Sequence, residues 1–448
     1  MPDKYDVIII GGGNAGFGVS SVVHDAGKSI AFIESDEFGG TCPNRGCTPK
    51  KLLVAAAHAL DEIERASIHG ISVGSPSLDW PALIDRKSDM IAAIPDGMLG
   101  LAEKRGTVYR GTAKFVGTNT VEVDGKVIEG DNIVIATGSK PRPLPIPGAE
   151  LMITSDEVLS ERELPKDVVF VGGGVIAMEF AHVYARAGAK VTILEALPQL
   201  LPRADADAVD ALQAETERLG VRIMTNVTVH GIAETDGKLR IDFSHDGRDH
   251  SELAARVVNG TGRVANVDSL NLAAANVAHD GLKVEVDQFL RSTTNPSVWV
   301  AGDALVQSPQ LSPVATYEGR IVGRNIVEGP SLVPDYDTIP NSVYTVPAMS
   351  SVGLTEAQAT ASGRDISVKT SDMTGWFSGK TYGETAAFAK VLVDAESDHI
   401  VGAHLVGHHG EELIHLFAMA MKYKIPAADL RDNIFAFPTF SSDVKSMI

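Results

Sequence analysis

The sequence predicts an α/β chain in which one strand–helix–strand unit occurs twice, followed by a separate C-terminal α+β domain. Three observations predict this class. A short β-branched strand runs into three consecutive glycines at two places, after Ile10 and after Val171. An acid follows each glycine run at the same distance, as Glu34 in the first copy and Glu195 in the second. From about Val333 onward the glycine loops stop and alternating strands occur.

The first copy has the features of a Rossmann-like unit. Its expected elements are a strand over 7–10, a helix over 17–26 and a second strand over 29–33. Glycines are needed after the first strand because a pyrophosphate must approach the backbone and the helix N-terminus closely. An acid at the end of the second strand can accept a hydrogen bond from a ribose hydroxyl. Gly11, Gly13, Gly16 and Glu34 are therefore predicted to bind a dinucleotide.

The second copy repeats this pattern with a strand over 168–171, a helix through Ala187 and a strand over 190–194. The acid lies 23 positions after the first glycine in each copy, 34 − 11 and 195 − 172. A repeat of this regularity implies two dinucleotide sites. The second site would use Gly172, Gly174, Ala177 and Glu195.

Strands that end in glycine follow each copy and complete the expected sheets. These strands lead to Gly138 and to Gly262. A further strand over 298–300 leads to Asp303, whose carboxylate can reach a chain of sugar-like hydroxyls lying over a sheet edge.

Cys42 and Cys47 are the only cysteines in 448 residues. Pro49 favours the start of a helix just after Cys47, and an apolar run from Leu52 continues it. A sulfur at such a helix start lies near unpaired backbone N–H groups and nearby lysines, which favour its thiolate. The pair is predicted to be redox-active, because a structural disulfide of a secreted domain fits poorly with a large, acidic, cysteine-poor chain.

Composition narrows the classes of partner. The chain has 39 Lys plus Arg against 58 Asp plus Glu, a formal net charge of −19. Such a charge disfavours nucleic acid and anionic membranes as partners. No window approaches eighteen consecutive apolar residues and the N-terminus begins directly with a strand, so we expect a cytoplasmic protein without a targeting segment. No metal site is predicted.

These motifs resemble the FAD-dependent pyridine nucleotide–disulfide oxidoreductases, which include lipoamide dehydrogenase, glutathione reductase and mercuric reductase. The resemblance is carried by the segment 39–51, both glycine loops, the strand end at Gly138 and the segment 301–303. It implies two Rossmann-like domains, for FAD and NAD(P), and a C-terminal α+β dimerisation domain in a homodimer. The implied boundaries are 1–145 and 265–333 for the FAD domain, 146–264 for the NAD(P) domain and 334–448 for the dimerisation domain.

The resemblance also implies roles for individual residues. Cys47 would be the cysteine nearer the flavin, whose thiolate forms a charge-transfer interaction, and Cys42 the thiol that exchanges with the substrate. Lys51, rather than Lys50, would lie near the flavin N5, with Glu179 as its ion-pair partner. The implied cofactor contacts are Gly11, Gly13, Gly16, Glu34, Thr41, Gly138 and Asp303 for FAD, and Gly172, Gly174, Ala177, Glu195 and Gly262 for the nicotinamide nucleotide.

The expected nucleotide is NADH, and NADPH is the alternative. Glu195 would accept hydrogen bonds from a ribose diol but would repel a 2′-phosphate. Arg203 lies within reach in the sequence and argues in the opposite direction, since NADPH-dependent relatives place arginine there.

The chain departs from the family at its C-terminus. Most members have a His-Pro-Thr-x-x-Glu segment whose histidine, held by the glutamate, takes the proton of the partner subunit's exchange thiol. Phe437 and Ser442 occupy these two positions here. We expect a cis peptide before Pro438, and we expect Phe437 to face the partner subunit's Cys42. Four histidines nearby, His404, His408, His409 and His415, are expected on a surface or an interface.

The predicted reaction carries hydride from NAD(P)H through FAD to a Cys42–Cys47 disulfide and on to a small disulfide-type acceptor. Because phenylalanine cannot move a proton, alternatives remain open. One is a reductase of a quinone, a metal ion or a persulfide-like acceptor. The other is a redox-sensing flavoprotein with slow turnover.

Overall fold

The computed structural model describes residues 2–281 and 283–448. The chain divides into two compact units, each assembled from three stretches of sequence. The first unit comprises Met1–Lys50, Asp85–Arg142 and Arg263–Tyr336; the second comprises Lys51–Ile84, Pro143–Gly262 and Asp337–Ile448.

The sheet of the first unit has the strand order β3-β2-β1-β6-β5-β4, with β16 beside β6. Its strands are β1 (Asp3–Ile10), β2 (Ile30–Glu34), β3 (Thr107–Arg110), β4 (Ala113–Phe115), β5 (Thr120–Val123), β6 (Lys126–Ile135) and β16 (Val298–Val300). The strands β3, β2, β1, β6 and β16 pair in parallel. Ile10 lies beside Ile33 on one side and Ile135 on the other. Such strands are buried on both faces, which explains the continuous apolar run in β1.

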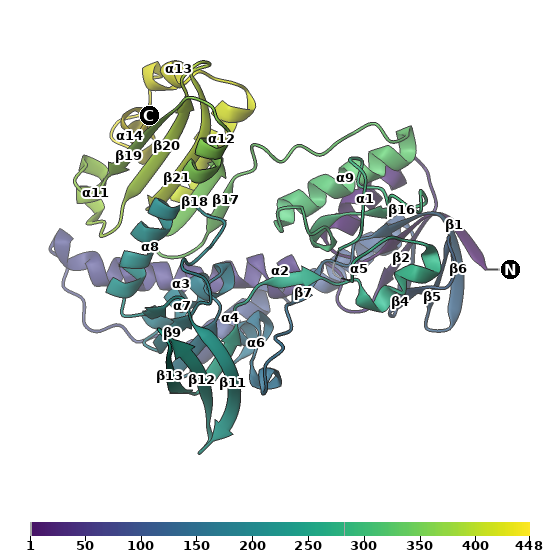
Figure 1. Cartoon of the computed structure of the whole chain (residues 1–448), viewed down its shortest axis with the longest axis horizontal. Helices are drawn as coiled ribbons and strands as arrows, with labels where there is room; N and C mark the ends of the chain where they lie inside the picture. Colours follow the sequence, from purple (N-terminus) through teal and green to yellow (C-terminus); the bar gives the residue numbers. More distant parts are fainter. Residues whose placement is uncertain (1, 282) are drawn as a thin grey trace. The chain divides into compact units, whose positions relative to one another are not determined.

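Two long helices of the first unit, α1 (Asn14–Asp25) and α9 (Ser312–Glu328), pack side by side (Figure 1). Glycines permit this approach. A Cβ on Gly18 would lie 2.5 Å from the Thr316 carbonyl oxygen, and one on Gly319 would lie 2.2 Å from that of Ala15. The remaining elements are α2 (Thr41–Arg45), α5 (Ile94–Arg105) and the antiparallel pair β7 (Ser139–Pro141) and β15 (Arg263–Ala265). The helices α3 (Cys47–Arg65) and α4 (Trp80–Ile91) each continue from one unit into the other.

The second unit contains the second copy of the repeat, in a parallel sheet of order β10-β9-β8-β14. Its strands are β8 (Asp167–Val171), β9 (Lys190–Leu194), β10 (Arg222–Met224) and β14 (Arg256–Asn259). The helices beside it are α6 (Ser155–Ser160), α7 (Val175–Arg186) and α8 (Ala206–Arg218). An antiparallel sheet follows, formed by β11 (Thr228–Thr235), β12 (Lys238–His245) and β13 (Arg248–Ala254). The predicted strand–helix–strand repeat is confirmed.

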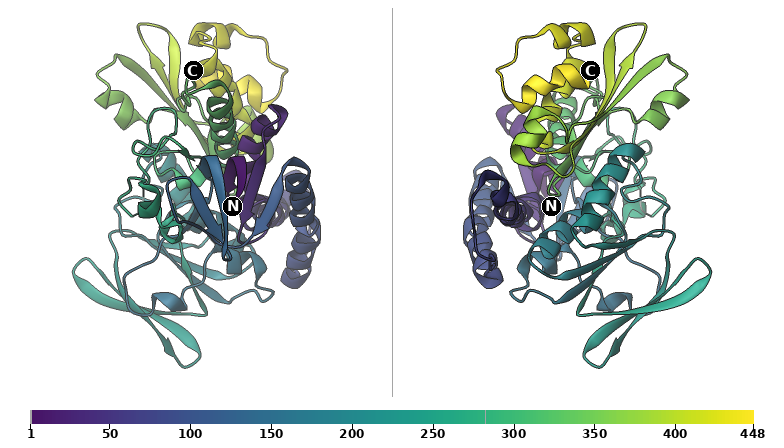
Figure 2. Two further views of the ribbon diagram at one scale, coloured as in Figure 1. Left: turned by 90° about the vertical axis from the view of Figure 1, so that its right-hand side faces the viewer. Right: turned by 90° about the vertical axis from the view of Figure 1, so that its left-hand side faces the viewer.

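The C-terminal part of the second unit is an antiparallel sheet of order β17-β18-β21-β20-β19. Its strands are β17 (Asn341–Val343), β18 (Ala348–Gly353), β19 (Ile366–Asp372), β20 (Phe388–Asp394) and β21 (His399–Gly407). Its helices are α10 (Glu356–Ala361), α11 (Phe377–Tyr382), α12 (Gly410–Lys422), α13 (Ala427–Asp432) and α14 (Phe440–Met447). Figure 2 shows the yellow helices of the chain end gathered on one side of the green strands. The predicted α+β class is confirmed.

The two faces of this sheet have different neighbours. Ala389 and Leu405 are buried in a core with Leu413 and Val444, which lie on α12 and α14. Because side chains alternate along a strand, Lys390 of β20 points to the opposite face, where α8 contacts β20 and β21. One face of the sheet therefore packs against α8, which belongs to the domain with the second glycine loop. The other face packs against the C-terminal helices.

Candidate active site

The two cysteines lie in two successive helices, Cys42 near the start of the short helix α2 and Cys47 at the start of the long helix α3. Both are free thiols; Cys42 is half-buried and Cys47 is exposed. Gly46 between them leaves no room for a side chain, since a Cβ would lie 2.9 Å from the carbonyl oxygen of Thr41. This close turn brings the two sulfurs within hydrogen-bonding distance of each other.

Two side chains from distant parts of the sequence complete the surroundings of the Cys42 sulfur. Ser312 and Asn14 both hydrogen-bond to it, and the Asn14 amide also donates to the Ser312 hydroxyl. They are the first residues of α9 and α1, so the close packing of these two helices holds them at the cysteine. Neither residue could be predicted from the sequence, because no local pattern links residues 298 positions apart.

When both cysteines are reduced, Cys42 loses its proton more readily than Cys47 does. Hydrogen bonds from Cys47, Ser312 and Asn14 lower the pKa of Cys42 to about 6. The hydrogen bond that Cys47 donates to Cys42 raises the pKa of Cys47, while the positive charge of Lys50 acts in the opposite direction. The first negative charge therefore resides on Cys42, the sulfur predicted to exchange with the substrate. The charge-transfer thiolate assigned to Cys47 in the FAD-bound protein stays a prediction.

Tyr344 contacts both of the residues that were predicted to form an ion pair. The Lys51 ammonium is 4.2 Å from the centre of the Tyr344 ring and 3.7 Å from Glu411 Oε1. Glu179 is only 4% exposed and accepts a hydrogen bond of 2.8 Å from the backbone N–H of Tyr344. The roles assigned to Lys51 and Glu179 beside a flavin stay predictions.

The first glycine loop has the shape that a pyrophosphate requires. Gly11 has φ of 114°, and a Cβ on it would lie 2.2 Å from the carbonyl oxygen of Ala136. A Cβ on Gly16 would lie 2.2 Å from the carbonyl oxygen of Gly11. Gly13 precedes α1 without a capping side chain, so the first N–H groups of this helix are directed toward the loop.

The second loop follows the same plan with one substitution. Gly172 has φ of 98°, and a Cβ there would lie 2.7 Å from the carbonyl of Gly260. Gly174 precedes α7, again without a capping side chain. Ala177 takes the place of the third glycine and is fully buried. Gly262, beyond β14, also has a positive φ, of 98°.

The two acids make matching hydrogen bonds in the two copies. Glu34 accepts the N–H of Gly12 at 2.7 Å, and Glu195 accepts the N–H of Gly173. Each acid also accepts the N–H of the residue two positions further along, at 2.8 Å. Both carboxylates therefore fix the glycine loop and stand at its edge, where a ribose would lie.

The ends of the neighbouring strands offer groups that fit FAD. Thr137 has a buried hydroxyl without a hydrogen-bond partner among the described residues. Asp303 accepts a hydrogen bond of 3.1 Å from the Ser139 hydroxyl, and burial raises its pKa. Gly138, between Thr137 and Ser139, has a positive φ of 68°. An unsatisfied hydroxyl and a buried carboxylate beside an open glycine loop suit the ribose, phosphate and ribityl groups of this cofactor.

The C-terminal segment is exposed at the position of the missing histidine. Phe437 is 81% exposed, and the predicted cis peptide before Pro438 is confirmed. Thr439 and Ser442 form a capping box at the start of α14. Ser442 therefore has a structural role at the position where the family has a glutamate. Whether Phe437 faces the partner subunit's Cys42 stays a prediction.

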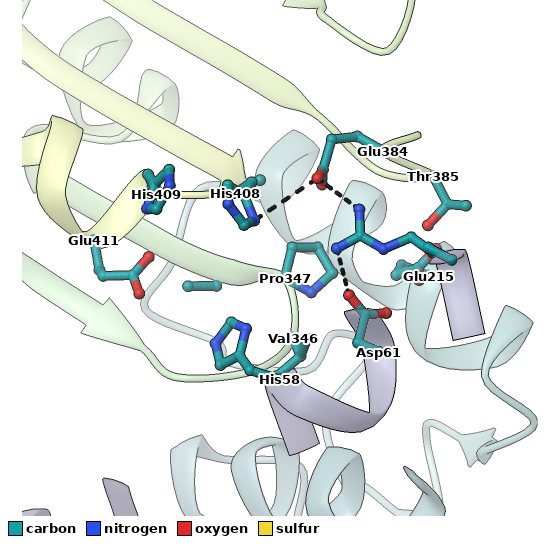
Figure 3. Close-up of a pocket in the computed structure, with 13 residues that line it drawn as sticks. His58, Asp61, Glu215, Val346, Pro347, Glu384, Thr385, His408, His409 and Glu411 are labelled. Atoms are coloured by element: carbon teal, nitrogen blue, oxygen red, sulfur yellow. Dashed lines mark hydrogen bonds and ion pairs between the residues drawn. The ribbon is translucent and has the colours of Figure 1, made fainter. Parts of the chain in front are cut away.

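A polar pocket lies between the second half of α3 and the C-terminal sheet (Figure 3). Arg65 donates to Asp61 at 2.6 Å and to Glu384 at 2.8 Å. His408 Nδ1 lies 3.8 Å from Glu384 Oε1. Burial raises the pKa of Glu384, and burial and the neighbouring His409 lower that of His408 to about 4. This cluster could not be predicted from the sequence, because its members come from separate segments.

Of the four histidines expected on a surface or an interface, His404 is buried and His408 is partly buried. His404 is 2% exposed and its Nε2 lies 2.9 Å from the Leu354 carbonyl oxygen. His408 is packed against the rings of Tyr382 and Phe440, at 5.2 and 5.4 Å between centroids. The expectation was wrong for His404, which elements distant in sequence cover. The other two, His409 and His415, are exposed as expected.

Within residues 2–281 and 283–448, no three His, Cys, Asp or Glu side chains are grouped so as to hold a metal ion. In the same part of the chain, no helix combines the length and the apolar composition needed to cross a bilayer.

The family models and the relatives of known name indicate the same family for this chain. Residues 5–319 match the model of the pyridine nucleotide-disulphide oxidoreductases, and residues 339–448 match that of their dimerisation domain. A dihydrolipoyl dehydrogenase of Chlamydia pneumoniae is 31% identical, covering 98% of this chain and 95% of the relative. A glutathione reductase of Burkholderia cepacia is also 31% identical, covering 99% and 98%.

A solved structure is similar over the whole chain. The HOCl-induced flavoprotein disulfide reductase RclA of Escherichia coli, in its Cu(II) complex, superposes with a TM-score of 0.88 at 29% identity. The match covers 99% of each chain.

Proposed function

Because this chain belongs to the pyridine nucleotide-disulphide oxidoreductase family, we propose that its homodimer uses NADH to reduce the Cys42–Cys47 pair and passes the electrons to an acceptor. When bound, FAD would supply the two-electron link between the nucleotide and the disulfide. The observation that carries the proposal is the hydrogen-bonded cysteine pair, with the pKa of Cys42 lowered to about 6. The acidic, cysteine-poor chain suits the cytoplasm, where thiols are kept reduced.

The pair can carry out disulfide exchange with Cys42 as the nucleophile. The Cys42 thiolate attacks one sulfur of the acceptor disulfide, which forms a mixed disulfide and releases one thiolate that takes a proton from solvent. Cys47 then loses its proton and attacks the Cys42 sulfur, so the intramolecular disulfide forms and the second thiol leaves. Ser312 and Asn14 hold the attacking thiolate in place by hydrogen bonds.

The presence of Phe437 in place of the histidine favours a second kind of acceptor, a metal ion. General acid–base help is worth about a hundred- to ten-thousand-fold in rate, and Phe437 cannot provide it. An acceptor that needs no proton avoids this loss. Two Cu(II) ions would each take one electron from the cysteine pair, giving two Cu(I) ions and the disulfide, with the thiol proton released to water. The similar RclA was solved as a Cu(II) complex, which supports the same acceptor here.

We assign NADH as the donor on the position of Glu195. This carboxylate stands at the edge of the second glycine loop, held by the Gly173 N–H. A 2′-phosphate would be placed beside its negative charge, whereas a ribose diol can donate to it. Comparing the Kd values of the FAD-loaded protein for NAD⁺ and NADP⁺ tests this assignment, and a tighter NADP⁺ complex would refute it.

The test of the proposed function separates the two halves of the reaction. The FAD-loaded protein is oxidised, mixed anaerobically with one equivalent of NADH, and then alkylated. We expect alkylation at both Cys42 and Cys47 after NADH and at neither without it, whereas in Cys47→Ser, which cannot form the disulfide, alkylation of Cys42 should not depend on NADH. Oxidised lipoamide, glutathione disulfide, a quinone and Cu(II) are then compared as acceptors at equal concentration. Flavin reduction that leaves both cysteines unalkylated would overturn the proposal.

A further inference from the structure

The segment 196–205 links the second glycine loop to the C-terminal domain. It begins directly after Glu195 and ends at Asp205, which precedes α8. Within it, the Leu201 N–H donates to the carbonyl oxygen of Gly173 at 3.0 Å, and the Ala204 N–H donates to that of Leu201 at 2.8 Å. Leu201 has a positive φ of 47°, which few residues adopt, so this turn is held in one specific conformation. One end of the segment is therefore fixed against the second glycine loop.

The other end is fixed by Lys390. The Lys390 ammonium lies 2.9 Å from Asp205 Oδ1, 2.6 Å from Asp207 Oδ2 and 2.6 Å from Glu356 Oε2. The side chains of Lys390 and Asp205 are each 2% exposed. The second oxygen of Asp205 accepts the backbone N–H of Glu356 at 3.0 Å. Asp205 thus contacts the C-terminal domain through both of its oxygens, Oδ1 in an ion pair and Oδ2 in a hydrogen bond.

The strand register explains why Lys390 reaches this place. Lys390 of β20 is paired with His404 of β21, and both point away from the face that α12 and α14 cover. A buried lysine is tolerated only when its charge is compensated, and three carboxylates surround this one. Two of them come from the segment before α8 and its first turn, and one comes from the C-terminal domain.

We propose that Lys390 is a positioning residue for the nicotinamide nucleotide. Through Asp205 it holds the segment 196–205 against the Gly173 loop, so that the C-terminal domain sets the affinity of the nucleotide site. The inference rests on the proposed use of the second glycine loop by NADH. The new element is Lys390, a residue of the C-terminal domain, on which the shape of the nucleotide site depends.

The experiment compares Lys390→Met with Lys390→Arg in the FAD-loaded protein. We expect Lys390→Met to raise the Kd for NAD⁺ roughly tenfold, within the range of couplings transmitted through packed networks. The limiting rate of flavin reduction at saturating NADH should change less than about twofold, since the residue does not touch the reacting atoms. Lys390→Arg retains the charge and should restore most of the affinity. Asp207→Asn is the matched control: Asp207 is half exposed and the Asp205 contact stays in place, so its Kd should be nearly unchanged.

Hydrogen exchange provides a readout that does not depend on the nucleotide. In Lys390→Met the N–H groups of Leu201 and Ala204 should exchange faster than in the unchanged protein, while those of β1 in the other unit should not. If Lys390→Met unfolds, Asp205→Asn gives a milder break of the same contact. An unchanged Kd together with unchanged exchange in a folded variant would overturn the inference. Failure of the unchanged protein to bind NAD⁺ would instead overturn the proposed function.

Discussion

Thr439 and Ser442 hold each other's backbone at the start of α14. The Ser442 N–H donates to the Thr439 hydroxyl at 3.1 Å, and the Thr439 N–H donates to the Ser442 hydroxyl at 3.3 Å. Ser442 occupies the position of the glutamate that relatives use to hold a catalytic histidine. Glutamate is itself the preferred residue at this place of a capping box, so the helix start is compatible with either residue.

The double substitution Phe437→His with Ser442→Glu should therefore be accommodated and should supply an acid–base pair. Phe437 is 81% exposed, so its replacement should change stability by less than about 0.5 kcal/mol. If the proposed dimer places residue 437 at the exchange thiol, turnover of a disulfide substrate should rise by about a hundredfold or more. Steady-state rates with glutathione disulfide and oxidised lipoamide measure this. Each single substitution is the control, and a double variant no faster than the singles would contradict the expected position of Phe437.

The reactivity of Cys42 should depend on pH with a midpoint near its lowered pKa of about 6. The thiolate is the reactive form, so alkylation should be slow below pH 6 and reach its plateau above it. Cys47→Ala and Ser312→Ala each remove one donor to the Cys42 thiolate, so both should move the midpoint upward. The measurement is the iodoacetamide rate of the reduced protein between pH 4 and 9, followed by mass spectrometry of the peptide that contains Cys42. A midpoint near 8.5, the value of an ordinary thiol, would contradict the hydrogen-bonded arrangement.

The close contact of α1 and α9 predicts opposite effects for two glycine-to-alanine changes. In Gly319→Ala the new Cβ would lie 2.2 Å from the Ala15 carbonyl oxygen, so the helices must separate, at a cost of about 1–3 kcal/mol. In Gly100→Ala, on α5, the new Cβ meets nothing within 4 Å, and the change should stabilise by about 0.5–1 kcal/mol. Urea denaturation of both variants measures the difference. Because α9 also carries Ser312, Gly319→Ala should in addition raise the pKa of Cys42.

The sequence predicted features whose causes are local and missed those that depend on distant segments. The glycine loops, Glu34 and Glu195 lie within one strand–helix–strand unit, where the backbone itself demands glycine and an acid. Ser312 reaches Cys42 only because two helices pack closely, and no periodicity reveals such a contact.

His408 shows the same limit in a different way. We expected it on a surface or an interface, but rings contributed by α11 and α14 pack against it and leave it only partly exposed. The interactions of Lys51 with Tyr344 and Glu411 likewise depend on how α3 packs against the C-terminal domain, which a helix pattern does not specify.

The ion pairs of Arg65 predict a stability loss that depends on pH. Arg65→Met leaves Glu384 without its cation, while Asp61 keeps its ion pair with Arg186 at 2.9 Å, and breaking such a partly buried network costs about 3 kcal/mol. Burial already raises the pKa of Glu384 in the folded chain, so the folded state holds this proton to a higher pH than the unfolded chain does. Stability from this group therefore falls as pH rises through that range, and removal of Arg65 strengthens the effect because it raises the pKa further.

Thermal midpoints at pH 5 and pH 8 measure this dependence. The deficit of Arg65→Met relative to the unchanged protein should be larger at pH 8, where Glu384 would be ionised without its partner. Arg324→Met is the matched control, because Arg324 pairs with Glu328 on an exposed helix surface and its loss should cost at most about 0.5 kcal/mol at either pH. A deficit of Arg65→Met that is equal at both pH values would show that the Arg65–Glu384 contact does not control the ionisation of this carboxyl group.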